Sequence, residues 1–245
     1  MFNVTTLIIL FMNLLMVQTQ PTAEQIIQKV DENINSDNRI TQSKMIIRGN
    51  RGERIIESRS WSVGDEKALT EYLSPAREEG TKMLKLDDEL YIYSPSTDRT
   101  IRLSGHMLRQ SVMGSDLSYE DMMEDRKLLD AYNAEIIKED TLDGRNVYVL
   151  ELNAKVDDIA YVKRQMWIDS ERFIPLKEEL YAKSGQVLKK TSYSDVTKID
   201  GRWFPRTVVY KDMLKDGDGT VFTLDEIKFN QDIPDYIFSK AALKR

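Results

Sequence analysis

The chain has 245 residues, of which 35 are Lys or Arg, 41 are Asp or Glu, one is His (His106) and none is Cys. The lack of Cys excludes disulfides, thiol nucleophiles and metal–thiolate centres, and a single His excludes a His-rich metal site. The net charge of −6 argues against nucleic acid as a partner, because binding it requires a concentrated basic surface.

An apolar run at residues 7–17 opens the chain. As a helix it would rise only about 16 Å, well short of the ~30 Å hydrocarbon core of a membrane. Its length is typical of a secretory signal, although no Lys or Arg precedes it. We therefore expect a signal peptide at 1–20 and one exported domain at 21–245, with a buried N-terminal helix as the alternative to a signal.

A helix is expected next. Thr22 and Gln25 have the spacing of a capping box, and Ile26, Ile27, Val30 and Ile34 follow at helical spacing. After Asp37 the apolar period switches to two, which predicts strands. These strands are expected at 44–48, 53–63, 81–86, 89–94, 99–104, 136–139, 146–152, 162–169, 176–183, 187–193, 203–210 and 220–229. A short closing helix is expected at 234–243.

Short turns separate most of these strands, so helical crossovers cannot join them and the sheet must be largely antiparallel. A sheet of ten or more such strands curls into a barrel or half-barrel. The predicted class is therefore mainly β (α+β).

The segment 104–132 breaks the pattern. It is rich in Met and Leu, and Ser118-Tyr-Glu-Asp121 has the [ST]-x-x-[DE] signature of a helix start. Unbranched thioethers suit surfaces that adapt to variable apolar shapes. Two interpretations remain open: a plug that fills the open end of the barrel, or a movable lid.

No catalytic constellation emerges. Asp216-Gly-Asp-Gly219 fits a hairpin turn better than a calcium loop, because Leu214 falls where an acidic ligand is required. The carboxylates of Glu120, Asp121, Glu124 and Asp125 are interpreted as a solvated helix face and not as an acid–base pair. We expect no enzyme activity, cofactor or metal site.

Several segments resemble a known family. They are Leu90-Tyr-Ile-Tyr-Ser-Pro95, Gln110-Ser-Val-Met-Gly-Ser-Asp-Leu-Ser-Tyr-Glu-Asp121, Met166-Trp-Ile-Asp169 and Gly201-Arg-Trp-Phe-Pro205. Together they resemble the outer membrane lipoprotein-sorting proteins of the LolA/LolB-like superfamily of periplasmic carriers, over roughly residues 22–243. The resemblance implies an incomplete antiparallel β-barrel whose mouth is closed by short helices.

The resemblance also implies a monomeric periplasmic carrier that shields lipoprotein acyl chains, or another lipid, between an inner-membrane transporter and an outer-membrane acceptor. The alternative is an interaction module or accessory subunit of an envelope transport system. The family's Arg-Pro latch cannot be placed, because neither Arg59 nor Arg77 is followed by Pro. The candidate lining of the cavity is Trp61, Met83, Tyr91, Tyr93, Met166 and Trp167. The candidate lid is Met107, Met113, Gly114, Ser115, Asp116, Tyr119, Met122 and Met123.

Overall fold

The computed structural model describes residues 20–49, 52–124 and 126–244. The expected signal peptide lies almost wholly outside these residues. Within the described part of the chain, no helix combines the length and the apolar character needed to cross a membrane.

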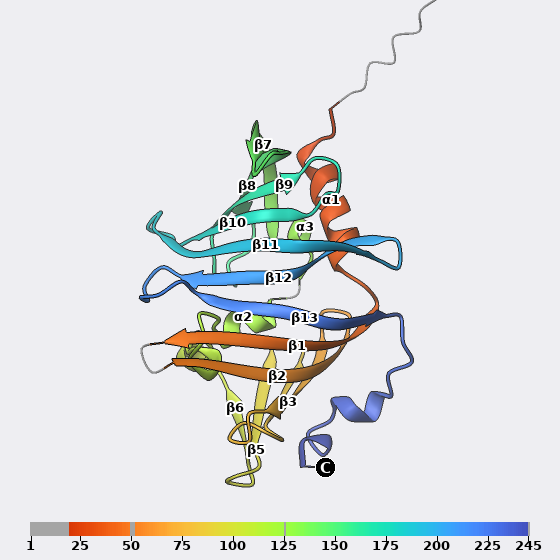
Figure 1. Ribbon diagram of the computed structural model, residues 1–245, viewed down its shortest axis with the longest axis vertical. Helices are drawn as coiled ribbons and strands as arrows, with labels where there is room; N and C mark the ends of the chain where they lie inside the picture. Colours follow the sequence, from red (N-terminus) through yellow and green to blue (C-terminus); the bar gives the residue numbers. More distant parts are fainter. Residues whose placement is uncertain (1–19, 50–51, 125, 245) are drawn as a thin grey trace, which may run out of the picture.

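One antiparallel sheet dominates the fold (Figure 1). The described residues contribute thirteen strands to it, in the order β6-β5-β4-β3-β2-β1-β13-β12-β11-β10-β9-β8-β7. The strands are β1 (Asn38–Gly49), β2 (Gly52–Val63), β3 (Lys67–Ser74), β4 (Lys82–Leu86), β5 (Glu89–Ser94), β6 (Arg99–Leu103), β7 (Tyr132–Leu142), β8 (Arg145–Ala154), β9 (Lys163–Asp169), β10 (Pro175–Tyr181), β11 (Val187–Ile199), β12 (Arg202–Asp212) and β13 (Thr220–Phe229).

The sheet does not close, because its edge strands β6 and β7 do not pair with each other. The first and last strands instead pair in its middle, where Met45 of β1 lies opposite Phe222 of β13. The predicted mainly-β, antiparallel half-barrel is confirmed. Strand β3 is not predicted by the sequence pattern, because Ala68 and Thr70, on the concave face of the sheet, give no apolar alternation.

Helix α1 (Ala23–Ile34) is confirmed, including its capping box. The Gln25 amide donates to Thr22 Oγ1 at 3.3 Å, and the Thr22 amide donates to Gln25 Oε1 at 2.9 Å. Ile26, Ile27 and Val30 are fully buried and pack against the β8 and β9 side chains Leu150, Leu152, Met166 and Ile168. Helix α1 therefore covers one end of the concave face.

The expectation of a single closing helix at 234–243 is wrong. Two 3₁₀ turns, η3 (Asp235–Phe238) and η4 (Ala242–Lys244), stand there instead. Phe238 and Leu243 pack on Leu69, Leu84 and Tyr91. Because side chains alternate along a strand, this is the face opposite Thr70, which lines the cavity described below. The C-terminal segment thus covers the outer face of the sheet and does not close the mouth.

Candidate functional site

The segment from Gly105 to Glu124, here called the strap, starts beyond edge strand β6 and leads through α3 (Leu128–Ala131) to the opposite edge strand, β7. It contains η1 (Gly105–Arg109), η2 (Val112–Gly114) and α2 (Tyr119–Met123) (Figure 1). Because β6 and β7 are the two ends of an open sheet, the chain must cross between them, and it does so over the concave face.

The underside of the strap is apolar. Val112 and Leu117 are buried against Met45, Ile56 and Tyr72 of the sheet, and the partly buried Met113, Tyr119 and Met122 join this cluster. A second group of strap side chains, Met107, Leu108 and Met123, packs with Met83, Leu90 and Leu103. The Met-rich stretch therefore covers the concave face. That this stretch acts as a movable lid remains a prediction.

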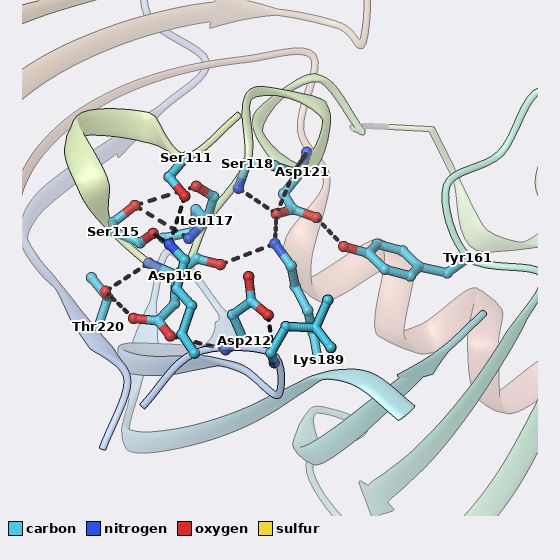
Figure 2. A network of polar contacts seen from close by, with 12 residues as sticks. Ser111, Ser115, Asp116, Leu117, Ser118, Asp121, Tyr161, Lys189, Asp212 and Thr220 are labelled. Atoms are coloured by element: carbon cyan, nitrogen blue, oxygen red, sulfur yellow. Dashed lines mark hydrogen bonds and ion pairs between the residues drawn. The ribbon is translucent and has the colours of Figure 1, made fainter. Parts of the chain in front are cut away.

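Asp116 fastens the strap to strand β13 (Figure 2). Thr220 Oγ1 accepts from the Asp116 amide at 2.9 Å and donates to Asp116 Oδ2 at 2.7 Å. The amide of Asp212 donates to Asp116 Oδ1 at 3.0 Å. Ser115 and Asp116 are both buried. Gly114 precedes them with φ +78°, a conformation that L side chains rarely adopt. The Met-Gly-Ser-Asp motif thus forms a structural anchor.

A buried ion pair fastens the strap to strand β11 (Figure 2). Lys189 donates to Asp121 Oδ2 and, at 3.0 Å, to the Asp116 carbonyl. Tyr161 donates to Asp121 Oδ1 at 2.5 Å. Burial alone would raise the pKa of Asp121, but the charge and hydrogen bond of Lys189, with the Tyr161 hydrogen bond, hold that pKa below its usual range. The expectation of a solvated helix face is therefore wrong for Asp121, whose side chain is 11% exposed.

Further contacts tie the strap on both sides. Lys215 donates to Ser111 Oγ at 2.6 Å and also to the Ser115 carbonyl. On the opposite wall, Arg54 of β2 donates to the Met113 carbonyl at 2.5 Å, and Lys85 of β4 donates to the Met123 carbonyl at 2.7 Å. The strap is therefore held by two walls of the half-barrel.

A cavity of about 340 Å³, here called the central cavity, lies between the strap and the sheet. Strands β1–β3, strands β12–β13 and the strap supply its walls. Among its lining residues are Thr41, Met45, Ile56, Ser60, Thr70, Tyr72, Val112, Leu117, Asp121, Met122, Val208, Phe222, Leu224 and Ile227. This volume is at the lower end of the ~300–1,000 Å³ typical of small-molecule sites.

A second, larger pocket of about 870 Å³, the mouth pocket, lies among α1, α3 and the adjacent ends of β1 and β2. Arg39 and Ser62 line both spaces, so the two adjoin. Asp31 of α1 lines the mouth pocket, and burial is the main cause that raises its pKa to about 6.

Replacing Asp31 with Asn is expected to stabilise the protein by about 1 kcal/mol at pH 7, allowing for the partial exposure of the site. An acid whose folded pKa exceeds its unfolded value of about 3.9 costs stability as pH rises through that interval. The gain should therefore vanish near pH 4. Thermal unfolding at both pH values checks this, with Glu32→Gln on the exposed side of α1 as control. An equal effect at the two pH values would contradict it.

The structure does not bring the six predicted lining residues together. Trp61 lines the central cavity. Trp61 and Tyr93 both pack with the apolar cluster under the C-terminal segment. Tyr91 is buried in that cluster, Met83 lies under the strap, and Met166 lies under α1. Trp167 lies beside Lys177, whose Nζ is 4.1 Å from the ring centroid.

Sequence reasoning missed a buried polar group on β9–β11. Arg164 Nε lies 3.6 Å from Glu178 Oε1, and Tyr193 donates to Glu178 Oε2 at 3.1 Å. Arg164 also lies over the Tyr132 ring, at 5.1 Å from its centroid. Charged residues that alternate with apolar ones along a strand are typical of a solvent-exposed face. The sequence pattern therefore does not predict that Arg164 and Glu178 are buried.

Solved structures share this overall fold. A LolA superfamily protein from Nitrosomonas europaea is 27% identical, with a TM-score of 0.77, over 91% of this chain and 100% of that chain. A DUF1329 family protein from Desulfovibrio piger is 24% identical, with a TM-score of 0.81, over 89% of this chain and 96% of that one. A domain from Vibrio parahaemolyticus assigned to outer membrane lipoprotein-sorting proteins is 24% identical, with a TM-score of 0.78, over 91% of this chain and 100% of that chain.

The fold is that of the LolA superfamily, which confirms the resemblance drawn from the motifs. A family model described as "Uncharacterized protein" matches residues 64–245, and the chain belongs to that family. No curated protein matches the sequence.

Proposed function

We propose that the protein is a non-enzymatic periplasmic carrier that binds an acyl chain in the central cavity. The observation that carries this proposal is the cavity itself, closed by a strap whose underside is Val112, Leu117 and Met122. Each CH₂ removed from water contributes about 0.8 kcal/mol, so an apolar hollow is sufficient to hold such a ligand.

The strap supports a carrier because its fastening is polar while its underside is apolar. The contacts of Asp116 and Asp121 hold it in the closed position, whereas the Met side chains beneath it can adapt to different apolar shapes. A carrier must also release its load, so the closed and open positions of the strap should lie close in free energy. Lipoprotein acyl chains are the cargo that the superfamily relationship favours, with an inner-membrane donor and an outer-membrane acceptor as partners.

Native mass spectrometry of protein purified from envelope extracts, together with displacement of a fluorescent acyl probe, tests the proposal. A co-purifying lipid or lipoprotein, and saturable probe binding, are expected. Absence of both would contradict the carrier and favour an interaction module on the same fold. Turnover of an ester or glycoside that is lost in Asp121→Asn would contradict the non-enzymatic assignment.

A further inference from the structure

The lining of the central cavity changes along strands β1–β3 from the strap to the mouth. Under the strap it is apolar, with Met45 opposite Ile56. Two residues farther along each strand from this pair, Ser43 and Ser58 share a hydrogen bond of 3.0 Å; beyond them lie the hydroxyls of Thr41, Ser60 and Thr70. The wall formed by β12 and β13 carries the apolar residues Val208, Phe222, Leu224 and Ile227 together with Arg206. The Arg206 guanidinium donates to Thr197 Oγ1 at 3.3 Å and to the Asp225 carbonyl at 3.2 Å.

Arg39 marks the end of the hydroxyl stretch. It lies opposite Ser62 in the β1–β2 register, and both residues line the central cavity and the mouth pocket. Its guanidinium donates to the carbonyl of Ile34 at 3.5 Å, near the end of α1. The cationic guanidinium of Arg39 therefore lies where the hydroxyl-lined part of the central cavity meets the mouth pocket.

Acidic side chains surround the mouth pocket beyond Arg39. The pocket is lined by five acidic residues and, besides Arg39, by two basic ones. The acidic residues are Asp31, Glu32, Asp37, Asp65 and Asp130, and the basic ones are Lys127 and Arg202. Arg202 is engaged with backbone carbonyls, since it donates to Glu32 O at 3.0 Å and to Asn35 O. The outer part of the mouth is therefore suited to a cation.

Along strands β1–β3 from the strap into the mouth pocket, the order of chemistries is thus apolar, hydroxyl, cationic and acidic. It is complementary to a lipid tail, a glycerol ester, a phosphate and an ammonium group, in that order. We infer that the ligand is a single-chain zwitterionic phospholipid, bound tail first with its phosphate at Arg39 and its ammonium among the acids of the mouth. This inference rests on the proposed acyl-chain binding and names a phospholipid as the cargo in place of a lipoprotein. The volume of the central cavity, about 340 Å³, is at the lower end of the ~300–1,000 Å³ typical of small-molecule sites. This small volume favours a ligand with one acyl chain over a ligand with two or three.

Competition against the fluorescent acyl probe tests the inference, with four competitors kept below their micellar concentrations. These are lysophosphatidylcholine, palmitate, hexadecyltrimethylammonium and a triacylated lipopeptide. We expect lysophosphatidylcholine to displace the probe at a concentration about tenfold lower than any other competitor, a difference typical of one well-placed polar contact. Equal potency of the four, or greatest potency of the lipopeptide or of palmitate, would overturn the inference and leave acyl binding intact. Displacement by none would overturn the carrier function itself.

Two variants locate the preference. Arg39→Gln should remove most of the advantage of lysophosphatidylcholine over hexadecyltrimethylammonium, and Arg39→Lys should retain it. Because Arg39 also contacts Ile34, a second variant is made at Asp65, an exposed residue that lines the mouth pocket. Asp65→Asn should weaken lysophosphatidylcholine relative to palmitate. An unchanged order of potency in both Arg39→Gln and Asp65→Asn would overturn the assignment of the head group to this mouth.

Discussion

Replacing Lys189 with Met is expected to lower the free energy of unfolding by about 3–5 kcal/mol at pH 7, because it leaves the buried Asp121 carboxylate without its counter-ion. The Lys189 and Asp121 side chains are only 10% and 11% exposed. The double variant Lys189→Met/Asp121→Leu should recover much of the loss, since it removes both charges. Urea unfolding of the three proteins measures these differences.

The pH dependence gives this prediction a second readout. In the native protein the pKa of Asp121 is lowered, so its contribution to stability is present above about pH 4 and is lost as pH falls through the folded pKa. Without Lys189, burial would raise that pKa, and the deficit of the variant should shrink on acidification.

The neighbouring Lys190 is the matched control. It pairs with Glu179 at 3.3 Å and is 43% exposed, so Lys190→Met should cost at most about 1 kcal/mol. Similar losses for Lys189→Met and Lys190→Met would show that the strap is not held by a buried pair. A Val112→Cys probe, introduced in a chain without Cys, should react with thiol reagents faster when Lys189→Met is also present.

Filling the central cavity with Ser60→Trp is expected to weaken acyl binding by at least about tenfold, or 1.4 kcal/mol. Ser60 is half-buried, lines the cavity and shares a hydrogen bond of 2.8 Å with Thr70. An indole at this position would occupy the hydroxyl-lined stretch of the central cavity, between the β1–β3 wall and the β12–β13 wall. Titration of the fluorescent acyl probe measures the loss.

Two controls separate occlusion from other effects. Ser60→Ala removes the hydrogen bond without filling the cavity and should bind almost as the native protein does. Arg59→Trp places the same ring on the opposite face of β2, where Arg59 is exposed. Unimpaired binding by Ser60→Trp, or equal loss in Arg59→Trp, would show that the acyl chain binds elsewhere.

Local patterns predicted much of the fold. The capping boxes at Thr22 and Ser118 are both present, because each depends on residues only three positions apart. The hairpin of β4 and β5 likewise followed from alternation around Asp87 and Asp88. Strand β3 escaped detection, since small and charged side chains take half of its positions.

The candidate site was harder to predict, because its contacts join distant parts of the chain. Lys189 lies 68 residues from Asp121, and Thr220 lies 104 residues from Asp116. Nothing in the sequence distinguishes Lys189 from the neighbouring charged residues of β10 and β11, so its burial could not be predicted. The Met-Gly-Ser-Asp motif was recognised as a family feature, but only the structure shows that Ser115 and Asp116 anchor the strap.

Photo-crosslinking with a fatty acid that carries a diazirine at its methyl end locates the bound acyl chain in the protein. Tail-first binding predicts that mass spectrometry will locate the label on residues beneath the strap, such as Met45, Val112 and Met122, and that excess unlabelled lipid will suppress it. Labelling confined to the outer face of the sheet, or labelling that unlabelled lipid does not suppress, would contradict a carrier that holds an acyl chain in its half-barrel.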